Sequence, residues 1–252
     1  MKLKSLSIAL VFLLTLGPAT INVHAQSNNS LQWGVEVGEE FTYVLQRAYF
    51  ANPSYRSVVE TDFPFIEGLV AGQKAIMTIE SLGTIPALIN ESSQIPTSYC
   101  SLVRANDSVV LSQNLVNFVQ PIGDWAFLGE MVNLTGFSGA TLIDTQNEWG
   151  TKGAASFRAG DGSIVTISLE IRYEKENGTL NYLREKYSTS GANLIDVLFV
   201  NWHPGMPTIV SEGPELVTVL VISIGAVVGL IISSLVYLGY KRKKPIVQRL
   251  GE

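Results

Sequence analysis

The feature that most constrains this chain is a run of 25 uncharged residues, 216–240, followed at once by Lys241-Arg242-Lys243-Lys244. At about 1.5 Å per helical residue, such a run would reach about 37 Å. The hydrocarbon core of a bilayer is roughly 30 Å thick, so a helix of this length can cross it with some tilt. The sequence therefore predicts one transmembrane helix over residues 216–240.

The N-terminus has the three-part layout of a secretory signal peptide. Lys2 and Lys4 precede an apolar stretch at 6–16, and small or apolar residues then lead to a cleavage point ahead of Gln26. The apolar stretch is too short to span a bilayer. We expect residues 1–25 to be a signal peptide, with an uncleaved N-terminal anchor as the alternative. No cysteine follows the cleavage point, so a lipid-anchored lipoprotein would lack its attachment residue.

Charge is divided unevenly between the two sides of the predicted span. Residues 26–215 contain 10 Lys and Arg and 21 Asp and Glu, so their formal charge is 10 − 21 = −11. The tail, residues 241–252, has 5 − 1 = +4. Because basic residues gather on the cytoplasmic side of membrane helices, we expect the tail inside and the acidic bulk outside. The prediction is a single-pass protein of the cell membrane whose partner is the bilayer, not a nucleic acid.

The exported domain, 26–202, is long enough for a core of its own, and its strand signals are strong. Strands are expected at 41–45, which is rich in β-forming residues, and at 75–79, which lies between Gly72 and Gly83. Apolar and polar residues alternate regularly from Val165 to Glu174. Asn177-Gly178 then supplies residues that tolerate positive φ in a hairpin turn. A partner strand follows with a bulge expected near Leu183-Arg184, and a last strand is expected at 194–200.

The middle of the domain has a helical pattern instead. Asn106-Asp107-Ser108 offers capping side chains, and apolar residues recur at three- and four-residue spacing up to Pro121. A shorter helix is expected after Gly123-Asp124. We therefore expect an α+β fold, an antiparallel β-rich domain built as a meander or as a half-barrel with covering helices. Residues 203–215, with three prolines and two glycines, are expected to form a stalk to the membrane.

Reactive constellations are scarce in the exported domain. His203 is its one histidine and Cys100 is the one cysteine of the chain, so they cannot supply a His/Cys zinc site or an intrachain disulfide. There is no Gly-rich phosphate loop and no calcium loop. We predict no catalytic, cofactor-binding or metal-binding residue, and an enzyme that uses an unidentified carboxylate pair is the third-ranked alternative. Cys100 is expected to be a buried small hydrophobe, with an intermolecular disulfide as the alternative.

Two further patterns suggest modification and association. The sequence has five Asn-x-Ser/Thr sequons, all in the exported part, and they predict a glycoprotein: Asn28, Asn90, Asn106, Asn133 and Asn177. Small residues follow one face of the predicted membrane helix, which favours a homodimer through close helix packing: Gly225, Gly229 and Ser233.

Two short motifs carry a resemblance. They are Trp33-Gly34-Val35 with Gly38-Glu39-Glu40-Phe41-Thr42-Tyr43, and Tyr173-Glu174-Lys175-Glu176-Asn177-Gly178-Thr179-Leu180. With them the exported part resembles uncharacterised archaeal single-pass surface proteins, a resemblance that implies no activity. The second motif is also similar to half-barrel lipoprotein carriers, which hold acyl chains between a curved sheet and covering helices. The missing lipobox cysteine departs from that second family.

These observations favour a non-enzymatic surface domain that binds an extracellular protein or another component of the cell envelope. The alternative is a carrier of a lipid or another apolar ligand in a half-barrel cavity. Four residues on the amphipathic covers would line such a cavity, although they would equally suit a closed core: Leu111, Leu115, Phe118 and Trp125. We expect no bound cofactor in either case.

Overall fold

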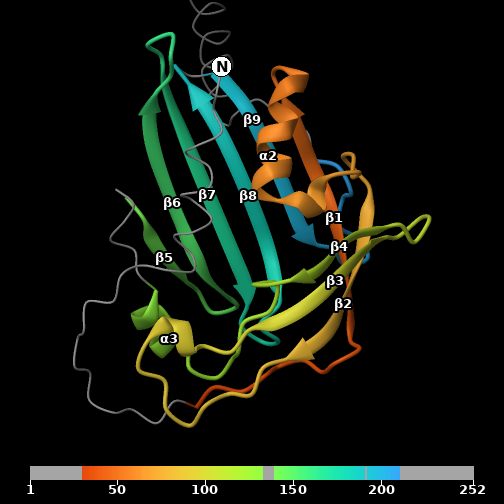
Figure 1. Ribbon diagram of the computed structural model, residues 1–252, viewed down its shortest axis with the longest axis vertical. Coiled ribbons are helices and arrows are strands. Elements are labelled where there is room, and N and C mark those ends of the chain that lie inside the picture. The colour runs from red at the N-terminus through yellow and green to blue at the C-terminus, as the bar shows by residue number, and fades with distance from the viewer. Residues whose placement is uncertain (1–29, 133–138, 191, 211–252) are drawn as a thin grey trace, which may run out of the picture. The chain divides into compact units, whose positions relative to one another are not determined.

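The computed structural model describes residues 30–132, 139–190 and 192–210, which belong to one compact unit that ends at Val210. Within these residues, nine antiparallel strands form one open sheet in the order β4-β3-β2-β1-β9-β8-β7-β6-β5 (Figure 1). The strands are β1 (Glu40–Phe50), β2 (Lys74–Leu82), β3 (Ser98–Arg104), β4 (Val110–Leu115), β5 (Thr141–Asp144), β6 (Glu148–Arg158), β7 (Ile164–Glu174), β8 (Leu180–Thr189) and β9 (Ala192–Asn201). The described helices are α2 (Arg56–Asp62), α3 (Trp125–Met131) and the short 3-10 turns η1 (Pro53–Tyr55), η2 (Pro64–Ile66) and η3 (Ser92–Gln94).

The sheet consists of two meanders joined side by side. Strands β1 to β4 pair in sequence order, β5 to β9 do the same, and β1 pairs with β9. Figure 1 shows β6 to β9 running lengthwise while β2, β3 and β4 cross them at a steep angle, as expected of a strongly twisted sheet. The antiparallel meander expected from the sequence is confirmed.

One face of the sheet, called the covered face below, packs beneath α2, η2 and α3. Its buried side chains form one cluster that includes Val59 of α2, Phe65 of η2 and Leu128 of α3. The alternation predicted in β7 is confirmed, since its apolar residues from Val165 to Tyr173 lie on this face. Helix α3 is confirmed as well, and the Asp124 carboxylate caps it by accepting from the Phe127 backbone N–H at 3.0 Å.

The predicted turn between β7 and β8 is also confirmed. Gly178 has φ 79°, and a Cβ built there would lie 2.0 Å from the carbonyl oxygen of Gln120. Asn177 holds the turn by accepting from the backbone N–H of Thr179 at 2.8 Å. The register shift between β7 and β8 lies opposite Leu180–Tyr182 rather than at Leu183-Arg184, so the predicted bulge is misplaced by about one pleat.

The prediction of a helix across 106–120 is wrong. Residues up to Arg104 form β3, the chain turns, and Val110–Leu115 returns as the edge strand β4. Ser108, Asn114 and Asn117 have positive φ, which a helix cannot contain. The capping residues serve the turn instead, where Asp107 pairs with Arg104 at 2.9 Å. Pairing with β3 satisfies the backbone N–H and C=O groups of β4. An amphipathic pattern within one segment does not reveal such pairing.

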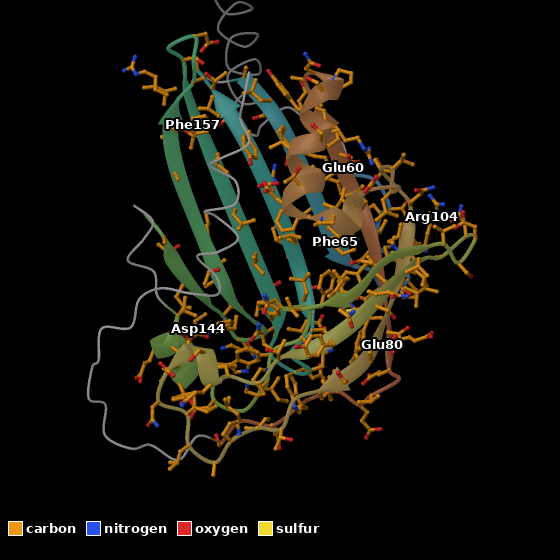
Figure 2. All side chains as sticks on the ribbon, viewed as in Figure 1. Glu60, Phe65, Glu80, Arg104, Asp144 and Phe157 are labelled. Carbon is orange, nitrogen blue, oxygen red and sulfur yellow. The ribbon has the colours of Figure 1, made fainter. Side chains whose placement is uncertain are left out.

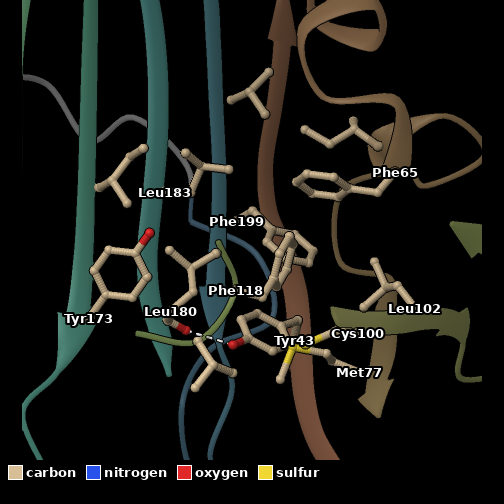
Figure 3. Packing of buried hydrophobic residues seen from close by; sticks show 14 of the residues in the cluster. Tyr43, Phe65, Met77, Cys100, Leu102, Phe118, Tyr173, Leu180, Leu183 and Phe199 are labelled. Atoms are coloured by element: carbon tan, nitrogen blue, oxygen red, sulfur yellow. Dashed lines mark hydrogen bonds between the residues drawn. The ribbon is translucent and has the colours of Figure 1, made fainter. Parts of the chain in front are cut away.

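Four aromatic rings form the centre of the core beneath the covered face (Figure 3). Tyr43 stacks on Phe199 with centroids 5.1 Å apart, and Phe65 and Phe118 contact Phe199 at 5.2 and 6.4 Å. The Tyr43 hydroxyl donates to the Leu180 carbonyl at 2.7 Å, as the dashed line in Figure 3 shows. Burial raises the pKa of Tyr43 well above its ordinary value, so this hydroxyl stays protonated.

The opposite, outer face carries a smaller cluster and a buried ion pair. Asp196 is fully buried and accepts from Arg47 at 2.6 Å and from Arg184 at 2.7 and 2.9 Å. Burial alone would raise the pKa of Asp196, but the two guanidinium groups outweigh it and the pKa is lowered. Arg47 also donates to the Val210 carbonyl at 3.2 Å.

The described part of the predicted stalk, residues 203–210, is bonded to the domain. Val210 donates its backbone N–H to the Gln46 carbonyl at 3.0 Å, and the Gln46 side chain donates to the Pro207 carbonyl at 2.7 Å. Residues 203–210 therefore follow the sheet instead of standing away from it.

Several expectations lie outside the described residues. They concern the signal peptide 1–25, the rest of the stalk, the membrane span 216–240 with its face at Gly225, Gly229 and Ser233, and the tail 241–252. Among the described helices, none combines the length and the apolar character needed to cross a membrane.

Candidate functional site

A cavity of about 630 Å³ lies between the covered face of the sheet and the segments that pack over it. This volume is typical of small-molecule sites, which run from about 300 to 1,000 Å³. Its walls come from β4, β6, β7, β8, η2, α3 and the loops next to them. Phe65 of η2, labelled in Figure 2, belongs to the lining and packs against Phe199 of β9.

The floor of the cavity is apolar. It includes Leu169 and Ile171 of β7 and Leu183 of β8, whose side chains leave the sheet on the covered face. On the neighbouring β6, Gly153 stands directly opposite Leu169 and Thr151 opposite Ile171. Because these two residues are small, they leave space above the sheet that larger side chains would fill.

The segment after β4 closes one end of the cavity. Its backbone is fixed to the β7–β8 hairpin, because Phe118 accepts from the Leu180 N–H at 2.7 Å and Gln120 donates to the Gly178 carbonyl at 2.8 Å. The Tyr173 hydroxyl donates to the Asn117 carbonyl at 2.9 Å. Burial raises the pKa of Tyr173 to about 12, so this hydrogen bond persists at neutral pH.

Polar residues without charge form a rim around the floor. They come from η3, from the end of the loop that follows it and the start of β3, and from β4 and the residues after it. They are Ser92, Ser93, Thr97, Ser98, Ser112, Gln113, Asn114, Asn117 and Gln120. Asp62, at the end of α2, is the one charged residue among the described residues of the lining.

A second acid, Glu185 of β8, interacts electrostatically with Asp62 and is only 2% exposed. The Tyr187 hydroxyl donates to it at 3.3 Å. Burial, with a further contribution from Asp62, raises the pKa of Glu185 to about 8. Glu185 is therefore mostly protonated at pH 7.

The four residues predicted to line a ligand cavity lie in different places. Leu115 and Phe118 belong to the lining. Leu111 and Trp125 pack against the core instead, and the Trp125 ring lies 5.4 Å from that of Trp149. The spacing that singled out Leu115 and Phe118 was interpreted as a helix. In the structure, β4 and the loop after it bring these two residues to the cavity.

Other lining residues were not singled out as ligand contacts. Leu169 and Ile171 were recognised as buried strand residues, but nothing in their alternation distinguishes a filled core from a cavity. Trp149 and Phe65 had no sequence signal, because β6 is poor in apolar alternation and η2 is only three residues long.

The remaining predicted positions are dispersed. Cys100 is fully buried and burial raises its pKa to about 12, so its thiol is not available to a partner in the folded domain. Asn90 and Asn106 are exposed, whereas Asn177 uses its side-chain amide to donate to Glu174 at 2.9 Å. Asn28 and Asn133 lie outside the described residues.

His203 is largely exposed and lies 3.6 Å from a Glu174 oxygen. In the part of the chain that the structure describes, no three His, Cys, Asp or Glu residues are grouped so that they could hold a metal ion.

Comparison of the chain with protein-family models, with curated proteins and with solved structures finds no match. The cavity and its lining are therefore the basis for a functional proposal.

Proposed function

We propose that this chain is a single-pass surface protein whose exported domain binds a lipid or another apolar ligand in a half-barrel cavity. The observation that carries the proposal is the cavity of about 630 Å³ over an apolar floor. Water fills an open cavity of this size, and an apolar occupant would remove apolar surface of the wall and of the ligand from that water.

The charge division and the apolar run at 216–240 support the membrane part of the proposal. They favour an acidic domain on the outside, anchored by one helix and able to present its cavity to molecules of the cell envelope. An uncharged rim suits binding without chemistry, so we propose a non-enzymatic role.

Binding is tested with the unit 30–210 and the uncharged fluorescent probe N-phenyl-1-naphthylamine. We expect saturable binding that Leu169→Trp weakens at least tenfold, because the indole occupies the floor of the cavity. The matched control is Ser168→Trp, which adds the same ring on the outer face of the same strand. Circular dichroism establishes that both variants are folded. Equal binding by folded Leu169→Trp and wild type would refute the proposal.

A further inference from the structure

The polarity of the cavity wall restricts the class of ligand, given the binding function proposed above. We infer that the ligand is an uncharged amphiphile, a long-chain molecule with a hydroxyl or carbonyl head, whose head meets the rim and whose chain lies on the floor.

The rim supplies hydrogen-bonding groups of both kinds. Gln113, Asn114 and Asn117 are exposed residues of β4 and its continuation that line the cavity, and Gln120 is half-buried beside them. An amide side chain both donates and accepts. Such a rim can therefore satisfy a hydroxyl or ester oxygen without any ionic partner.

The floor offers mainly dispersion and burial to the rest of the ligand. Leu169, Ile171 and Leu183 of the sheet line the cavity, and so do Leu128 and Met131 of α3. Each methylene placed there leaves water for an apolar surface, which favours binding. A long-chain ligand can therefore place its polar head in hydrogen bonds with the rim amides while its hydrocarbon chain lies on the apolar floor.

Charge argues against an anionic head. No lysine or arginine belongs to the described lining, and its one charged residue is the acid Asp62. A carboxylate or phosphate at the rim would find no counter-ion in the described lining and would share the cavity with the acid Asp62, a like charge. A cationic head has a potential partner in Asp62, so the experiment must separate an alcohol from an amine.

The experiment uses the full chain in phosphatidylcholine nanodiscs and four brominated probes with the same chain, which quench a tryptophan that they contact. The probes are 9,10-dibromo-octadecanol, 9,10-dibromo-octadecane, 9,10-dibromostearate and 9,10-dibromo-octadecylamine. Trp149 is a wall residue and serves as the reporter. Quenching that disappears in Trp149→Phe is assigned to the cavity, and Trp202→Phe is the matched control because Trp202 lies outside the lining and packs against the cluster on the outer face.

We expect the alcohol to bind at least fivefold more tightly than the alkane, the fatty acid or the amine. Replacing both rim amides, Gln113→Leu with Gln120→Leu, should reduce the preference for alcohol over alkane to less than twofold. Gln73→Leu, an amide outside the lining, should leave it unchanged.

Tighter binding of the fatty acid or the amine, or equal binding of alcohol and alkane, would overturn the inference while leaving an apolar site intact. If none of the four probes quenches Trp149, the proposed binding function itself fails. The two failures are thus distinguishable.

Discussion

Phe199→Ala is expected to destabilise the domain by about 3–5 kcal/mol. Phe199 is fully buried and contacts three other rings, those of Tyr43, Phe65 and Phe118. The substitution removes the partner on which these rings pack, in the part of the sheet where β1 and β9 join the two meanders. The loss is measured by urea unfolding of the unit 30–210.

The matched control for Phe199 is Tyr49→Ala. Tyr49 lies on β1 with 48% of its surface exposed, so its truncation should cost less than about 1 kcal/mol. Equal losses for the two variants would contradict the placement of the core.

Glu185→Gln should abolish a loss of stability that the wild type shows on going from pH 5 to pH 8. The pKa of Glu185 is raised from 4.5 to about 8, first by burial and then by Asp62. Above pH 4.5 the unfolded chain releases this proton while the folded domain keeps it. Stability therefore falls by up to about 1.4 kcal/mol for each pH unit, until the pH passes the folded pKa.

The expected difference between wild type and Glu185→Gln is therefore small near pH 4.5 and on the order of several kcal/mol at pH 8. Urea unfolding at a series of pH values measures it. Glu176→Gln is the control, because Glu176 is an exposed residue of the β7–β8 turn. A wild-type stability that rises between pH 5 and pH 8 relative to Glu185→Gln would show that Glu185 is ionised in the folded domain.

Much of the sheet could be predicted because its signals are local. The alternation from Val165 to Glu174 and the Asn177-Gly178 turn specify β7, the hairpin and the return of β8. The strand β6 has no such signal, because small residues such as Gly153 and Ala154 leave neither of its faces clearly apolar or polar. Its position depends on β7, with which it pairs along its whole length.

The error over 106–120 has a physical origin. Spacings of three and four apolar residues describe a helical face only if the backbone is helical throughout, and Asn114 and Asn117 are in the left-handed region. Pairing of β4 with β3 is a tertiary contact that local pattern cannot report. Leu115 and Phe118 reach the cavity from this region. They were predicted as lining residues from a helical spacing, although the structure has no helix there.

The cavity itself could not be predicted from the sequence. Leu169 and Leu183 are ordinary core residues by pattern, and only the small side chains of β6 and the path of the segment after β4 leave space above them. A cavity is a property of how distant segments meet, and no local spacing encodes it.

The most direct test of the central claim is native mass spectrometry of the unit 30–210, purified from a host with its natural lipids and without detergent. We expect a bound mass that is released on denaturation, that is identified as an uncharged long-chain molecule and that is missing from Leu169→Trp. A wild-type domain that is fully folded and carries only the mass of its polypeptide would contradict it.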